Sequence, residues 1–91
     1  MYSLDIPPSV DERLANFAKS SPSINNKLQE LVNNPEAVAV PTGKPAIGDF
    51  YVNAGRYAIT FDINHDNQSV QLLSVVTRPY LHKLLTGKIQ I

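Results

Sequence analysis

The segment VVTRPYLHKLL, residues 75–85, contains the residue types that act on phosphate esters. Arg78 follows an apolar run, and His82 lies four residues later, so a helix would place both on one face. An arginine can hold a phosphate and stabilise negative charge that develops on it, and a histidine can transfer a proton near neutral pH. The pair indicates half of a phosphodiester-cleaving site; the simpler alternative is a strand cap beside a surface histidine.

Neighbouring segments add polar side chains that could reach the same place. Arg56 follows Gly55 in a predicted turn and is the third candidate for catalysis, with a plain turn charge as its alternative. The candidates for substrate binding come from these neighbouring segments and from a loop lysine; Tyr80 could instead cover the core, and Lys44 and Lys83 could instead be solvated charges. The candidates are Lys44, Tyr51, Asn53, Tyr80 and Lys83.

The sequence offers little for other kinds of chemistry. It has no cysteine, which excludes disulfides, thiol nucleophiles and thiolate metal sites. His65 has only Asp62 and Asp66 close to it along the chain, so we interpret it as a solvated turn residue rather than a metal ligand. Neither a phosphate-cradling glycine loop nor a Ser-His-Asp pattern is present. We therefore expect no metal and no cofactor.

Length and composition are those of a small globular protein. The 91 residues predict one domain over 1–91, and 43% apolar with 18% charged residues is typical of a folded chain. No apolar run approaches the roughly 18 residues of a membrane span, so no membrane partner is expected. The N-terminal stretch MYSLDIPPSVDER lacks the basic start and apolar core of a signal peptide, and we expect a cytoplasmic protein.

The net charge of zero argues against a strong, sequence-independent grip on nucleic acid, which normally requires a basic surface. The charge is unevenly distributed, however. Residues 1–43 carry three positive and five negative side chains, whereas residues 44–91 carry five positive and three negative ones. If a polyanion binds, we expect it on the C-terminal half.

The N-terminal half predicts a strand and two helices. Residues 2–6 alternate loosely and fit a short strand. Ser9 and Glu12 form a capping box that predicts the start of a helix. Ser21 is a suitable N-cap for a second helix, with Pro22 at its first position, and this helix should end at the Asn-Asn pair before the next proline.

The C-terminal half predicts three strands and a short helix. Residues 35–48 are predicted to form a connection that could contain an extended piece at 37–40. The strands are predicted at 50–54, 57–63 and 69–77, and the helix at 79–85, ended by Gly87. The last strand is apolar on both faces in its middle, which is typical of an interior strand.

The predicted element order is β-α-α-β-β-β with a final helix. In the second of the three strands, alternation separates two faces. One face carries Tyr57, Ile59, Phe61 and Ile63, and the other Ala58, Thr60 and Asp62. We expect an α+β fold in which one antiparallel sheet packs its apolar face on a helical hairpin.

This order, together with the segment GRYAITFDINHDNQSVQLLSVVTRPYLHKLL, resembles the RelE/ParE superfamily of bacterial toxins. The shared features are a glycine and an aromatic residue that open a strand, a polar hairpin turn, and an apolar strand that runs into an arginine. Gly55 and Tyr57 open the strand here, and Arg78 falls on the family's arginine. The helix ending in LQELVNNP is also similar to the family's second helix. The resemblance covers nearly the whole chain and implies a RelE-like fold.

The resemblance implies that the chain is the toxin of a two-gene toxin–antitoxin module. Toxins of the RelE type bind the ribosome and cut messenger RNA, through attack of a 2′-hydroxyl on the neighbouring phosphate. By this match Arg78 would stabilise that phosphate. His82 would take the place of a tyrosine that is common in the family and act as the acid or the base. The implied partners are a cognate antitoxin, the ribosome and messenger RNA, with the chain either monomeric or bound to its antitoxin.

The chain departs from the family's nucleases at several positions. Tyr51 and Asn53 stand where those nucleases carry basic residues, and Ala58 stands where a further arginine is usual. Arg56 is an imperfect substitute, because it lies two residues earlier in the chain. A second hypothesis therefore stays open: a non-catalytic protein of this fold that binds a protein target such as gyrase, or only its antitoxin.

Overall fold

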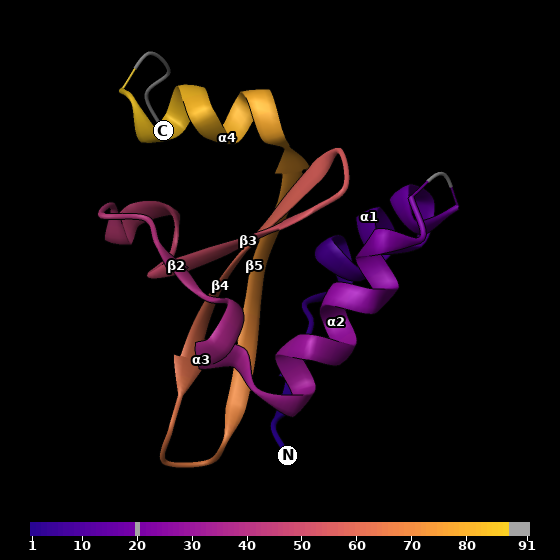
Figure 1. Cartoon of the computed structure of the whole chain (residues 1–91), viewed down its shortest axis with the longest axis vertical. Coiled ribbons are helices and arrows are strands. Elements are labelled where there is room, and N and C mark those ends of the chain that lie inside the picture. Colours follow the sequence, from indigo (N-terminus) through magenta and orange to yellow (C-terminus); the bar gives the residue numbers. More distant parts are fainter. Residues whose placement is uncertain (20, 88–91) are drawn as a thin grey trace.

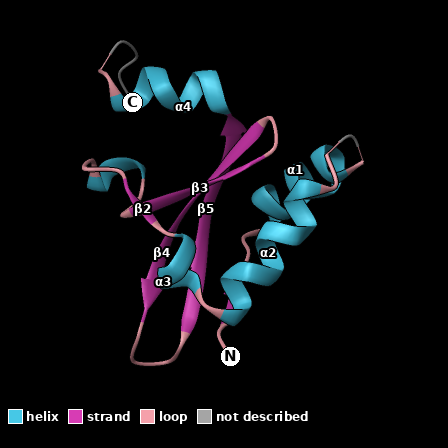
Figure 2. Cartoon of the chain, in the orientation of Figure 1, coloured by secondary structure: helices cyan, strands magenta, loops and turns pink. Residues whose placement is uncertain are grey.

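The computed structural model describes residues 1–19 and 21–87. Two helices pack side by side against one face of a sheet, and a last helix crosses the end of the strands (Figure 1). Figure 2 shows the same arrangement by type of element. The elements are β1 (Ser3–Asp5), α1 (Pro8–Ala18), α2 (Ser23–Asn33), α3 (Pro35–Val38), β2 (Val40–Pro41), the 3-10 helix η1 (Pro45–Ile47), β3 (Phe50–Ala54), β4 (Tyr57–Asn64), β5 (Ser69–Thr77) and α4 (Arg78–Leu85).

The described strands form a five-stranded sheet in the order β1-β5-β4-β3-β2. The predicted α+β class is confirmed, and β5 is the interior strand that its two apolar faces indicate. The prediction of a wholly antiparallel sheet is wrong in one respect, because β1 runs parallel to β5. Alternation in a strand indicates which residues face the core, but it carries no information about the direction of the neighbouring strand.

The main core lies between the sheet and the helical hairpin formed by α1 and α2. Ile24 and Leu31 of α2 are fully buried there, as are Ile59 and Phe61 of β4. The ring of Phe17 in α1 stacks on that of Tyr57, with centroids 4.3 Å apart, and thereby joins the hairpin to the start of β4. The predicted core face of β4 is thus the face that meets the hairpin.

The opposite face of β4 is also covered. Ala58 and Thr60 are buried, and the Thr60 hydroxyl lies 2.6 Å from the Ser74 hydroxyl on β5. A bulge at this point pairs Thr60 with Ser74 and Phe61 with Leu72, which leaves Leu73 as the extra residue. Leu73 is 40% exposed, so the bulge brings a large apolar side chain to the surface.

The helix starts differ from the predicted ones at the prolines. The helix α1 begins at Pro8 with Pro7 as N-cap, and no side chain caps it, so the predicted capping box of Ser9 is not formed. Instead the Pro7 carbonyl accepts hydrogen bonds from Val10 N and Asp11 N at 3.0 and 2.9 Å. Proline fixes its own φ near the helical value, and this local constraint starts the helix one residue before the serine.

Two other boundaries in this half also shift. The helix α2 begins at Ser23, with Pro22 as N-cap rather than as its first residue, and ends before Pro35 as predicted. The extended piece predicted at 37–40 is instead the helical turn α3 followed by the two-residue strand β2. None of the helices among the described residues is long and apolar enough to cross a membrane.

Candidate functional site

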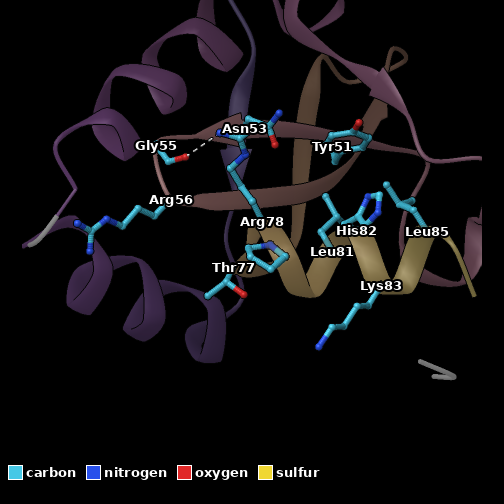
Figure 3. A pocket seen from close by; sticks show the side chains of 11 residues that line it. Tyr51, Asn53, Gly55, Arg56, Thr77, Arg78, Leu81, His82, Lys83 and Leu85 are labelled. Atoms are coloured by element: carbon cyan, nitrogen blue, oxygen red, sulfur yellow. Dashed lines mark hydrogen bonds between the residues drawn. The ribbon is translucent and has the colours of Figure 1, made fainter. Parts of the chain in front are cut away.

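A cavity of about 970 Å³ opens between α4 and the β3–β4 hairpin (Figure 3). It collects side chains from three segments that are separate in the sequence: β3, the β3–β4 turn, and the junction of β5 with α4. The lining residues are Tyr51, Asn53, Gly55, Arg56, Thr77, Arg78, Pro79, Leu81, His82, Lys83 and Leu85.

The helix α4 forms one wall of this cavity, and its first turn is fixed to the sheet. Thr77 is the N-cap, and its hydroxyl accepts a hydrogen bond from Tyr80 N at 3.4 Å. Arg78 N donates to the Arg56 carbonyl at 3.0 Å, which ties the end of β5 to the β3–β4 turn. Leu81 is 3% exposed and anchors the middle of the helix. The start of α4 is therefore fixed by these hydrogen bonds, and its middle by buried Leu81.

Gly55 shapes the turn that faces α4. Its φ is +65°, and a Cβ there would lie 2.7 Å from the Ser21 hydroxyl, so both backbone conformation and space require glycine. The Gly55 carbonyl accepts a hydrogen bond of 3.5 Å from Nη1 of Arg78. The arginine side chain is thus directed back across the cavity toward the turn (Figure 3).

Arg78 has most of its hydrogen-bonding capacity available for a ligand. A guanidinium carries five N–H donors in a planar fork, and the side chain makes a single long bond to Gly55 within the described part of the chain. No carboxylate in residues 1–19 and 21–87 forms an ion pair with it. An exposed cation without a protein counter-ion is suited to an anionic group such as phosphate.

His82 lies one turn after Arg78 on the same helix. Its ring points from α4 toward Tyr51 on β3, so Arg78 and His82 both extend from the helix toward β3 (Figure 3). The ring makes no hydrogen bond to any described residue, whereas the His82 backbone carbonyl accepts bonds from Thr86 N and from the Thr86 hydroxyl at 3.0 and 2.9 Å. The two predicted residues therefore line the same wall of the cavity, Arg78 at the end near Gly55 and Asn53 and His82 at the end near Tyr51 (Figure 3).

The other predicted lining residues divide into two groups. Tyr51 and Asn53 project from β3 and face α4, opposite Arg78 and His82 (Figure 3). Arg56 and Lys83 border the cavity, but their side chains extend away from it in the same view. The structure thus places Arg78, His82, Tyr51 and Asn53 in one constellation and directs the Arg56 guanidinium elsewhere.

Lys44 and Tyr80 do not line this cavity. The Lys44 ammonium donates to the Leu84 carbonyl in the last turn of α4, at 2.9 Å. Tyr80 is 43% exposed and lines a separate cavity of about 320 Å³, together with Ile47, Leu73 and other residues of η1, β5 and α4. Lys44 thus contacts the end of α4 from a loop, and Tyr80, which belongs to α4, lines a different cavity.

His65 is occupied by partners other than the aspartates close to it in sequence. Its Nδ1 lies 3.2 Å from the Tyr2 hydroxyl, and its Nε2 lies 3.2 Å from a carboxylate oxygen of Glu36. These contacts join the β4–β5 turn to the N-terminal segment and to α3. The described residues contain no group of three or more His, Cys, Asp or Glu side chains placed to hold a metal ion.

Sequence reasoning missed the apolar part of the cavity, formed by Pro79, Leu81 and Leu85. The signal that could have found it is the helical spacing itself. Positions 78, 81, 82 and 85 share one face of a helix, so the two leucines accompany Arg78 and His82. The polar pair therefore stands on an apolar floor, which excludes part of the water from any ligand bound there.

Comparisons with known proteins bear on the fold. No protein-family model matches the sequence, and no curated protein matches it. Among solved structures, a chain of the toxin–antitoxin complex RelBE2 from Mycobacterium tuberculosis matches with a TM-score of 0.66, over 85% of this chain and 98% of that one. The fold is RelE-like. At 18% identity the likeness concerns the RelE-like fold, and the activity has to be argued from the cavity.

Proposed function

We propose that the chain is the toxin of a toxin–antitoxin module and that it cuts messenger RNA on the ribosome. The RelE-like fold supports the toxin role. The observation that carries the nuclease role is the position of Arg78 and His82 on one wall of an open cavity, with no carboxylate of the described residues paired to either. A cation and a proton-transfer group on one face supply two of the groups that phosphodiester cleavage uses.

The proposed reaction is an intramolecular transfer at phosphorus. The 2′-hydroxyl oxygen attacks the adjacent phosphorus, and the bond from phosphorus to the 5′-oxygen of the next nucleotide breaks. One proton leaves the 2′-hydroxyl and one arrives at the departing oxygen, so the step yields a cyclic phosphate and a 5′-hydroxyl. Arg78 stabilises the charge that gathers on the non-bridging oxygens. His82 transfers one of the two protons, as acid or as base, and solvent water in the open cavity exchanges the other.

Tyr51 and Asn53 are proposed to bind the nucleotide. An exposed aromatic ring offers a stacking surface for an unpaired base, and an amide can hydrogen-bond to base or backbone groups. Both face α4 across the cavity, which fits an RNA strand lying between the helix and β3. Lys83 at the rim would add attraction for the backbone, while Lys44 and Tyr80 have no contact with the strand in this proposal.

A non-catalytic role is the second candidate, and specific observations favour it. Neutral side chains, Tyr51 and Asn53, occupy the β3 wall opposite Arg78, and the Arg56 guanidinium extends away from it. A cavity with one well-placed guanidinium binds an anionic side chain of a protein as readily as a phosphate. The protein would then act by binding a target such as gyrase, or would bind its antitoxin alone.

The antitoxin is proposed as the partner in either case, with the protein in the cytoplasm as one domain over 1–91. Beyond β1, which pairs with Ser69–Gln71, no described strand pairs with this edge of β5, although Arg13 of α1 lies against it and its Nη1 donates to the Val75 carbonyl at 3.2 Å. An unpaired strand edge is a ready template for an added strand. We propose that an antitoxin segment covers this edge of β5, the cavity beside α4, or both.

Primer extension on ribosome-bound message separates the two candidates. The nuclease proposal predicts cuts with the wild-type protein and about 100-fold slower cutting with Arg78→Ala, the usual size of effect when a transition-state donor is removed. Lys27→Ala is the matched control, because it removes a cation from the exposed Lys27–Glu30 pair on α2 and should leave cutting unchanged. An intact message with wild-type protein, alongside arrested supercoiling, would favour the gyrase-type role instead.

A further inference from the structure

The contact between Lys44 and α4 joins two segments that lie 40 residues apart in the sequence. The Lys44 ammonium donates to the Leu84 carbonyl at 2.9 Å, in a half-buried position. The last carbonyls of a helix have no partner within the helix, and a cation there also interacts favourably with the helix dipole. The Leu84 carbonyl also accepts a hydrogen bond from Gly87 N at 3.3 Å, so Lys44 adds a second, shorter bond and a positive charge at the end of α4.

The backbone that carries Lys44 is itself held in place. The Thr42 hydroxyl accepts a bond from Lys44 N at 3.0 Å and donates to the Gly48 carbonyl, and Ile47 N donates to the Lys44 carbonyl at 3.0 Å. Asp49, which follows Gly48, donates its backbone N–H to the Asp62 carboxylate on β4 at 2.8 Å. The lysine thus extends from a loop that is tied to the sheet.

The helix α4 has only eight residues, too few for a helix to be stable in water without tertiary contacts. Its first turn is fixed by the Thr77 cap and the bond from Arg78 N to Arg56. Its last turn, which follows His82 directly, is fixed by buried Leu84 and by the ammonium of Lys44. The direction of the His82 ring therefore depends on both ends of the helix being held.

We propose that Lys44 is a positioning residue, which holds the last turn of α4 so that His82 faces the cavity. This inference rests on the proposed nuclease function for its effect on cleavage, but the contact itself does not. It also assigns Lys44 a role other than phosphate binding, because its ammonium is engaged by the Leu84 carbonyl.

The test uses three variants and two kinds of measurement. Lys44→Met keeps the aliphatic stem and removes the charge, Lys44→Arg restores a donor, and Lys27→Met is the control for loss of a surface cation. Amide hydrogen exchange of residues 84–87 and the NMR signals of the His82 ring report on the helix end. Cleavage of ribosome-bound message, with kcat and KM separated, reports on the reaction.

We expect Lys44→Met to raise exchange at the end of α4 by about tenfold, the size expected for a charge at a helix terminus. The His82 ring signals should shift, kcat should fall by about tenfold with KM unchanged, and Lys44→Arg should recover most of the loss. Unchanged exchange and unchanged ring signals in Lys44→Met would overturn the inference. A rise in KM with normal exchange would overturn it as well, because that result means direct contact with RNA.

The two proposals fail in different ways. If the wild-type protein leaves the message intact, the nuclease function is overturned, while exchange and the His82 ring signals still decide whether Lys44 holds the helix. If Lys44→Met alters exchange and leaves cleavage unchanged, the positioning role in catalysis is overturned and the nuclease function stands.

Discussion

At the scale of single residues, the proposed nuclease function rests on the guanidinium of Arg78 and the imidazole of His82. Arg78 makes one long contact, with the Gly55 carbonyl, and neither side chain pairs with a carboxylate of the described residues. The four-residue spacing alone was enough to predict a shared face, because helical periodicity fixes it. What spacing could not provide is the direction of side chains on turns and loops.

Arg56 and Lys44 show that limit. The turn places the Arg56 backbone against Arg78 N, but leaves its side chain to extend away from the cavity. Lys44 reaches a carbonyl 40 residues away, a contact that depends on how the loop and α4 pack in three dimensions. The local sequence shows the periodicity of a helix or strand, but the directions of the Arg56 and Lys44 side chains depend on tertiary packing.

The direction of Arg56 leads to a prediction about its role. We expect Arg56→Ala to change the rate of message cleavage by less than about threefold, because its guanidinium points away from Arg78 and His82. An exposed cation of this kind contributes little beyond screened long-range attraction. The measurement is single-turnover cleavage beside the wild-type protein. A loss as large as that of Arg78→Ala would show that Arg56 turns into the cavity when RNA binds.

At the scale of elements, the strand bounds that the sequence predicted best are those marked by a glycine or a polar turn. The bounds of β3 and β5 agree with the predicted 50–54 and 69–77, since Gly55 and a polar turn interrupt the apolar alternation. The starts of α1 and α2 shifted because the prolines at those places act on the backbone more strongly than the serine caps. The parallel direction of β1 is set by packing and has no local signal.

The helix α4 should be held mainly by its buried leucines. Leu81 is 3% exposed, and we expect Leu81→Ala to lower the free energy of unfolding by about 2–4 kcal/mol, because it leaves a cavity under the helix. Leu73→Ala is the control. Leu73 is 40% exposed at the bulge, so this substitution should lower the free energy of unfolding by less than about 1 kcal/mol. Urea denaturation followed by circular dichroism measures both. Equal losses would contradict the packing described for α4.

At the scale of the whole molecule, the distribution of charge matters more than its sum. The chain is neutral, yet Arg56, Arg78 and Lys83 all lie around one cavity at the end of the sheet. A neutral protein has little general affinity for RNA, so productive binding would depend on the ribosome presenting the message to this cavity. Such dependence agrees with the proposed action on ribosome-bound message.

The central claim is that Arg78 and His82 act as one unit on a phosphodiester, and a double-mutant cycle tests it most directly. Cleavage rates on ribosome-bound message would be measured for the wild type, Arg78→Ala, His82→Ala and the double variant. Groups that act together give strongly non-additive losses, so we predict losses of about 100-fold or more for each single variant and little further loss for the double one. An uncut message with the wild-type protein, or single variants that cut at the wild-type rate, would contradict the nuclease account.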